Sequence, residues 1–158
     1  MTKRRPGRLP TWQEWSVYLS FGLLFATGLA WLLLDNFVQV AGEFGPEHHP
    51  AEHIVLIVHG VVAYGCLIVG GAMLPVHITL GWNTRRNYKS GVAFVAVLLM
   101  LAATALGIYY LGDEVLRHSV SIMHWVAGLI ALPLLLLHAL KGRAVSKTRL
   151  VAKQFEQG

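Results

Sequence analysis

The stretch from His118 to Lys141 reads H-S-V-S-I-M-H-W-V-A-G-L-I-A-L-P-L-L-L-L-H-A-L-K. Residues 119–140 carry no formal charge and are almost wholly apolar, and about 20 such residues cross a hydrocarbon core as an α-helix. His124 and His138 lie inside this span, where an imidazole needs a metal, a proton path or a buried partner. A separation of 14 residues (138 − 124), at about 100° per residue, places both on one face about 21 Å apart. The stretch therefore predicts a membrane helix that presents two imidazoles at two depths.

Three further uncharged apolar runs of spanning length occur in the 158-residue chain, which is 55% hydrophobic and only 13% charged. The four predicted spans are approximately Trp15 to Leu34, Ile54 to Leu80, Gly91 to Leu111 and Ser119 to Leu140. The expected fold class is all-α, an integral membrane four-helix bundle in which residues 1–158 form a single domain. We expect the first span to be retained, because it is too long for a signal peptide and has no small-residue cleavage site.

The net charge of +5 reflects membrane topology and does not indicate nucleic-acid binding. Twelve of the 13 Lys and Arg residues lie before the first span, between the second and third, or in the basic tail after the fourth, and only Arg117 lies on the other side. Because basic residues stay in the cytoplasm, we expect both termini there. The lone Cys66 is mid-span, where we expect a packing role.

A weak internal repeat relates the two halves of the chain. The segment F-A-T-G-L-A-W-L-L-L-D before the first outer loop resembles A-A-T-A-L-G-I-Y-Y-L-G-D before the second. The following segments, H-I-V-L-I-V-H-G-V-V-A and H-S-V-S-I-M-H-W-V-A-G, share the pattern H-x-x-x-x-x-H. The repeat predicts two helix hairpins that run in the same direction.

The second span carries its own pair of histidines. His59 and His77 are 18 residues apart (77 − 59), which is about five helical turns, so they share one face. Since the second and fourth spans run in the same direction, His59 and His124 are expected at matching outer depth. His77 and His138 form the expected inner pair, with a mismatch that helix tilt or a kink at Pro75 would absorb.

Pairs of neutral imidazoles that face each other across a helix bundle are typical of bis-histidine haem ligation. A zinc site would need more ligands clustered at one depth. Room for a porphyrin is expected beside Gly60, Gly65 and Gly128. Met73 is an alternative to His77 as the inner ligand, although a packing role is favoured for it.

Some polar residues near the ends of the spans are candidates for contact with the haem propionates. His53 and His118 mark the outer ends of their spans and are expected to be solvated or near a haem propionate. Arg117 is the outer candidate for a propionate partner. The inner candidates are Arg85, Arg86 and Lys141, with simple positive-inside charge as the alternative explanation.

The longer outer loop, residues 35–53, contains G-P-E-H-H-P-A-E-H. This segment could be a metal site or a proton-accepting surface, but an ordinary solvated loop with turns at Pro46 and Pro50 is favoured. If protons are released by quinol oxidation, the acceptors would lie in the group Glu47, His48, His49, Glu52 and His53.

Residues 12–143 resemble the four-helix di-haem cytochrome b superfamily, which includes bacterial cytochrome b561 and the membrane b subunits of hydrogenases and formate dehydrogenases. The resemblance is carried by T-G-L in the first span, His59 and His77 in the second, and H-W-V-A-G with L-L-L-L-H in the fourth. It implies two b haems stacked across a bacterial cytoplasmic membrane, with iron ligands His59, His124, His77 and His138, and electron exchange with quinone.

The expected function is therefore electron transfer between the quinone pool and a redox partner, as a subunit of a larger complex or with an outer-side electron-transfer protein. Quinone chemistry would occur at a haem edge or in a partner subunit. A small proton or ion transporter with a histidine relay is one alternative, but the residues between His124 and His138 are apolar. A membrane anchor without redox activity is the other.

Overall fold

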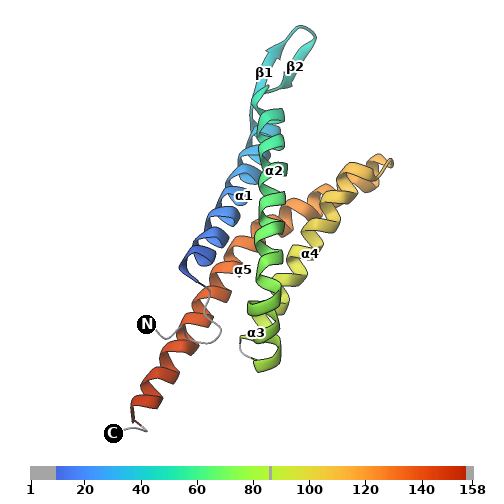
Figure 1. Ribbon diagram of the computed structural model, residues 1–158. Coiled ribbons are helices and arrows are strands. Elements are labelled where there is room, and N and C mark those ends of the chain that lie inside the picture. Colours follow the sequence, from blue (N-terminus) through green and yellow to red (C-terminus); the bar gives the residue numbers. More distant parts are fainter. Residues whose placement is uncertain (1–9, 86, 156–158) are drawn as a thin grey trace. The chain divides into compact units, whose positions relative to one another are not determined.

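The computed structural model describes residues 10–85 and 87–155, and these are mostly helical (Figure 1). The elements are α1 (Thr11–Phe37), β1 (Gln39–Gly42), β2 (Gly45–His48), α2 (Ala51–Met73), a π-helical turn (Leu74–Ile78), α3 (Thr79–Thr84), α4 (Tyr88–Tyr110) and α5 (Glu114–Phe155). Four segments are long and apolar enough to cross a membrane, namely α1, α2, α4 and residues 114–143 of α5. The four predicted spans are thus confirmed as helices.

The chain divides after His77 into two compact units. In the first unit, α1 and α2 lie side by side and are joined by an antiparallel hairpin of β1 and β2 (Figure 1). The hairpin pairs Gln39 with His48 and Gly42 with Gly45, which has φ +131° and therefore favours glycine. The sequence predicts that residues 35–53 form a solvated loop with turns at Pro46 and Pro50. The turn at Pro50 is present, but Pro46 lies in β2 and the tight turn is at Glu43 and Phe44, because backbone pairing on both sides of a tight turn needs little side-chain pattern.

The inner end of α2 changes its backbone hydrogen bonding around Pro75. The α-helix ends at Met73, and the following five residues form the π-helical turn, Leu74–Ile78. Proline lacks the N–H group that would continue the α-helical pattern, and wide turns of this kind accommodate such an interruption. The prediction that Pro75 kinks or closes this helix is confirmed.

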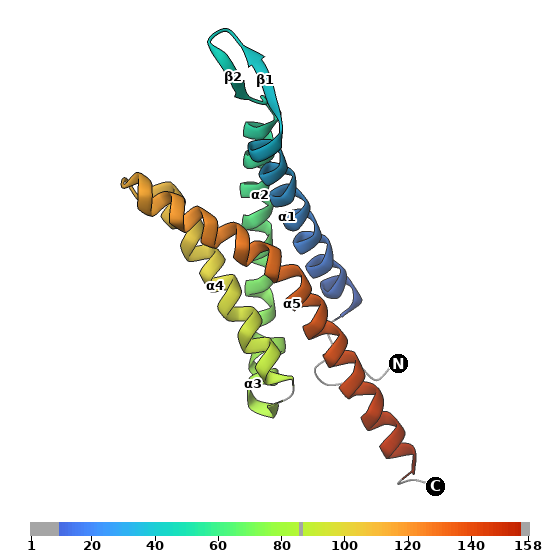
Figure 2. The same cartoon turned by 180° about the vertical axis from the view of Figure 1, so that it is seen from behind.

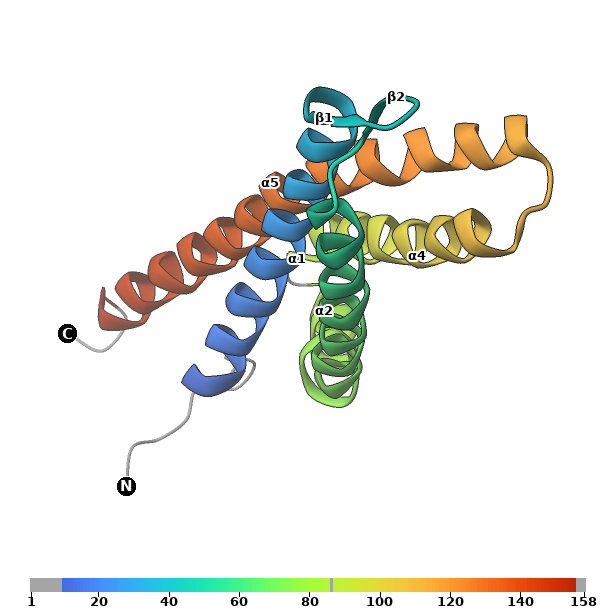
Figure 3. The same ribbon diagram turned by 90° about the horizontal axis from the view of Figure 1, so that it is seen from above.

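In the second unit, α4 and α5 form the other helix hairpin, which can be followed in Figures 2 and 3. Asp113 caps α5, since its Oδ1 accepts a hydrogen bond of 2.7 Å from the Leu116 backbone N–H. The helix has 42 residues and continues to Phe155, well beyond the predicted end at Leu140. Residues 143–155 contain neither glycine nor proline, so no helix breaker stops it.

The side-chain packing is typical of helices that face lipid. The buried apolar residues are few and mostly small or medium in size, namely Val17, Phe21, Cys66, Ala127, Ala131 and Leu135. Large apolar side chains such as Leu67 and Leu99 are exposed. Close helix contact is made instead at small residues. At Gly107 of α4, an added Cβ would lie 3.0 Å from Val120 Cγ1 on α5.

We predict that Gly107→Val lowers the stability of the second unit. The branched side chain would overlap Val120, and such overpacking costs about 1–3 kcal/mol. The measurement is denaturant titration of the full chain in micelles. Gly22→Val is the matched control, because a Cβ at Gly22 of α1 would meet nothing within 4 Å. Equal stability of the two variants would contradict the close α4–α5 contact.

Candidate functional site

His59 lies on the face of α2 that packs against α1. The ring is half-buried, and its Nδ1 lies 3.0 Å from Oγ1 of Thr27 on α1. The next residue of α1 is Gly28, where an added Cβ would lie 3.0 Å from His59 Cε1. The T-G pair therefore provides a hydrogen-bonding group and a gap that lets the imidazole lie against the neighbouring backbone.

His124 has a closely similar environment in the second unit. Its Nδ1 lies 2.9 Å from Oγ1 of Thr104, a residue of α4 that is only 7% exposed. Thr27 and Thr104 occupy equivalent positions in the repeat, F-A-T-G and A-A-T-A. The separation from threonine to histidine is 32 residues in the first unit and 20 in the second, and the longer first connection accounts for the difference of 12 (32 − 20).

The threonine hydroxyls favour one tautomer of each histidine ring. Each hydroxyl has one hydrogen, and the nearest acceptor is the carbonyl four residues earlier, Leu23 at 2.8 Å for Thr27 and Met100 at 2.7 Å for Thr104. A hydroxyl that donates to this carbonyl can accept a hydrogen bond from Nδ1–H of the histidine. A neutral ring in this arrangement has its lone pair on Nε2, the tautomer that a metal-ligating histidine adopts when Nδ1 is held by an outer partner.

His138 is held by a different group of residues, at the end of the second unit where α4 begins. Its Nδ1 lies 3.0 Å from Ser90 Oγ, and the Ser90 hydroxyl donates to Asn87 Oδ1 at 2.6 Å. Asn87 Nδ2, 3.3 Å from the same Nδ1, makes its shorter bond of 2.8 Å to the backbone carbonyl of His138. The Phe94 ring stacks nearly parallel to the imidazole, with centroids 6.4 Å apart. Ser90 and Asn87 therefore fix the position of the His138 ring.

A basic pocket of about 470 Å³ adjoins these residues. Its lining consists of Arg85, Asn87, Tyr88, Lys89, Ser90 and Lys141. The Arg85 guanidinium lies 5.0 Å from the centre of the Tyr88 ring, within the range of a cation–π contact. Two of the predicted inner propionate partners, Arg85 and Lys141, are therefore brought together beside the side chains that hold His138. Arg86 lies outside the described residues.

The remaining predicted site residues are dispersed. His77 and Met73 are both half-buried near the π-helical turn, and the choice between them as inner ligand stays a prediction. Arg117 and His118 are exposed in the first turns of α5. The predicted pairs His59–His124 and His77–His138 each join one unit to the other and also stay predictions.

The glycines expected to leave room for a porphyrin differ in their surroundings. An added Cβ at Gly60 or Gly65 would meet no atom of the described residues within 4 Å, whereas at Gly128 it would contact Leu101 at 4.0 Å. Two glycines that sequence reasoning did not single out lie directly against histidine rings, Gly28 at His59 and Gly91 at His138. In the sequence, each of these glycines directly follows a hydroxyl residue, as Thr27-Gly28 and Ser90-Gly91, and this repeated pair could have identified them.

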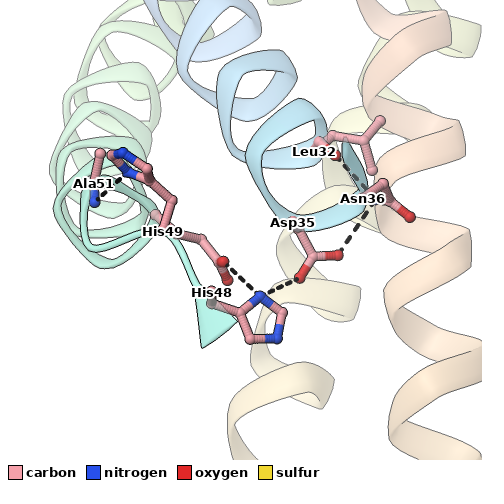
Figure 4. A network of polar contacts seen from close by, with 7 residues as sticks. Leu32, Asp35, Asn36, His48, His49 and Ala51 are labelled. Carbon is pink, nitrogen blue, oxygen red and sulfur yellow. Dashed lines mark hydrogen bonds and ion pairs between the residues drawn. The ribbon is translucent and has the colours of Figure 1, made fainter. Parts of the chain in front are cut away.

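The outer polar segment is ordered around the hairpin. His48, at the end of β2, lies between the carboxylates of Asp35 and Glu52 (Figure 4). His49 Nδ1 accepts a hydrogen bond of 3.1 Å from the Ala51 backbone N–H at the start of α2. The Glu47 side chain lies over Gly42 across the hairpin, and His53 is exposed. These candidates for proton acceptors therefore do not form one cluster.

No protein-family model, curated protein or solved structure matches this chain.

We predict that Thr27→Val and Thr104→Val each destabilise the chain by about 0.5–2 kcal/mol, because each removes the hydrogen bond between the threonine hydroxyl and a half-buried histidine ring. In ¹⁵N NMR spectra of haem-free protein, the Nδ1 of His59 or His124 should shift in the corresponding variant. Ser16→Ala is the control, since the Ser16 hydroxyl donates to the carbonyl of Trp12 on its own helix and not to a histidine. Unchanged histidine spectra in both threonine variants would contradict the assigned hydrogen bonds.

Proposed function

We propose that this chain is a di-haem b-type membrane cytochrome of the four-helix cytochrome b superfamily. The observation that carries the proposal is the repeated threonine–histidine bond, Thr27–His59 and Thr104–His124, at equivalent positions of the two units. A hydrogen-bonded Nδ1 with the lone pair on Nε2 is the state in which an imidazole ligates iron. Two such residues on helices of spanning length would supply both axial ligands of one haem.

We also propose a second haem, held at His138. His138 has its Nδ1 bonded to Ser90 and its ring beside Gly91, so it shares the features of the outer ligands. His77, or Met73 in its place, would be the opposite ligand. Arg85 and Lys141 in the basic pocket would neutralise the propionates of this inner haem. Arg117 would serve the outer one.

When bound, the two haems would supply one-electron chemistry at two depths of the bilayer. The chain's own residues hold the ligand rings in one tautomer and surround them with apolar helices that exclude water. We infer that electrons pass between quinone and a redox partner on the outer side of a bacterial cytoplasmic membrane, with both termini in the cytoplasm. The twelve basic residues on one side of the predicted spans support that orientation.

Quinol oxidation at the outer side would require a proton acceptor. His53 is exposed at the start of α2, whereas His49 is already hydrogen-bonded to the Ala51 backbone. We therefore place His53 before His49 and Glu47 as the acceptor.

The proposed function predicts a reduced-minus-oxidised spectrum with b-type bands and a haem-to-protein ratio near two for the purified full chain. His124→Ala and His59→Ala should each lower the ratio to about one, because each removes an outer ligand. His118→Ala tests the alternative outer ligand and should retain both haems. A colourless wild-type protein would overturn the cytochrome proposal, and haem loss in His118→Ala with retention in His124→Ala would overturn the ligand assignment.

The basic pocket yields a separate prediction. The double variant Arg85→Gln/Lys141→Gln should lower the midpoint potential of one haem by tens of millivolts, since removing nearby cations favours the more positive ferric state. Potentiometric titration in nanodiscs measures this change. Arg117→Gln is the comparison, because it should affect only the other haem. If both haems shift equally in the double variant, the pocket does not serve the inner site.

A further inference from the structure

Three ligand-bearing side chains converge at the outer end of the first unit. They are Asp35 near the end of α1, His48 at the end of β2 and Glu52 in the first turn of α2, as Figure 4 shows for the aspartate and histidine. One potential ligand atom from each, the histidine Nδ1 and two carboxylate oxygens, lies within 4.8 Å of the others. The hairpin register brings together residues that the sequence separates by up to 17 positions (52 − 35).

The distances are compatible with an ion pair and with a shared cation. His48 Nδ1 lies 2.8 Å from Glu52 Oε2, the length of a charge-assisted hydrogen bond, and 3.9 Å from Asp35 Oδ1. Zinc bound tetrahedrally at about 2.0–2.2 Å from each ligand would separate the ligand atoms by about 3.4 Å. That separation lies between the two observed values, so a bound ion would move His48 away from Glu52 and towards Asp35.

The Glu52 carboxylate is the more enclosed of the two acids. Its Oε2 is buried, and its partner among the described residues is the His48 ring at 2.8 Å, in a contact that does not have hydrogen-bond geometry. A buried carboxylate oxygen is stabilised by a positive charge, which either a protonated His48 or a bound cation would supply. The Asp35 carboxylate, in contrast, is oriented by Asn36, whose Nδ2 donates to Oδ2 at 3.3 Å and leaves Oδ1 facing His48.

The charge of residues 35–53 also favours the binding of a cation. Residues 35–53 contain four acids, Asp35, Glu43, Glu47 and Glu52, and no lysine or arginine. The two carboxylates around His48 therefore have no basic residue within their own segment to compensate them. His48 is 70% exposed, so an ion could reach the site from solvent.

We propose that Asp35, His48 and Glu52 bind a divalent transition-metal ion, with one imidazole nitrogen and two carboxylate oxygens as ligands. Borderline ions such as Zn²⁺ accept this mixed set, and solvent would complete the coordination. The ion would connect the end of α1 to the start of α2 and so stabilise the hairpin between them. This site is separate from the haem ligands and does not depend on the proposed redox function.

The test is isothermal titration of Zn²⁺ into the untagged, metal-stripped full chain in micelles. We expect one saturable site that is weakened at least tenfold in His48→Ala and in Glu52→Gln, because even outer-shell partners of a metal change affinity by about 10–100-fold. Zn²⁺ should also raise the melting temperature of the wild type and have little effect on that of either variant.

Two matched variants control for the other groups of the same segment. His53→Ala and Glu43→Gln remove an exposed imidazole and an exposed carboxylate and should retain wild-type affinity. Absence of saturable binding in the wild type, or equal affinity in His48→Ala and Glu52→Gln, would overturn the proposal. The proposal would also be overturned if both variants were less stable than the wild type without metal and Zn²⁺ raised the melting temperature of all three proteins equally. That result would identify the group as an ion pair.

Discussion

An imidazole within a membrane helix must have its polar atoms satisfied inside the protein, and this requirement organises both units. The neighbouring helix meets it with one side-chain hydroxyl, which lies within 3.0 Å of Nδ1 and also bonds to an acceptor on its own segment. Each bond needs close helix approach, and this explains the small residues beside the hydroxyls. Helix packing and ring orientation are consequently set by the same contact.

The two units share one threonine–histidine contact and differ elsewhere. Thr27 and Thr104 are equivalent, whereas His138 in the second unit is held by Ser90 in the first turn of α4 and by Asn87, which directly precedes that helix. The first connection is also longer and folds into a hairpin with its own cluster of ligand atoms. A duplicated framework therefore carries features that are specific to each half.

The spans could be predicted because apolar length alone decides whether a segment can cross the bilayer. Histidine spacing placed His59, His124 and His138 on helix faces, yet it could not reveal their hydroxyl partners, because threonine in a helix ordinarily bonds its own backbone and no periodicity distinguishes one that also faces a histidine. Arg85 and Lys141 are 56 positions apart (141 − 85). They share a pocket because α4 packs along α5 and because the turn at Arg85 and Asn87, with φ values of 53° and 52°, places Arg85 beside the start of α4. The hairpin was missed because its four-residue strands show no alternating pattern.

Asn87 contributes to the position of both the imidazole ring and the backbone of His138. Its amide holds the backbone carbonyl of His138, while its side-chain oxygen accepts from the serine that bonds the imidazole. Opening of this loop would release the histidine ring and its peptide group together. Any cofactor that ligates His138 would therefore slow hydrogen exchange in the loop as well as in α5, since binding and local folding are thermodynamically linked. The turn at Asn87 would therefore open less often when a cofactor is bound, although it supplies no ligand itself.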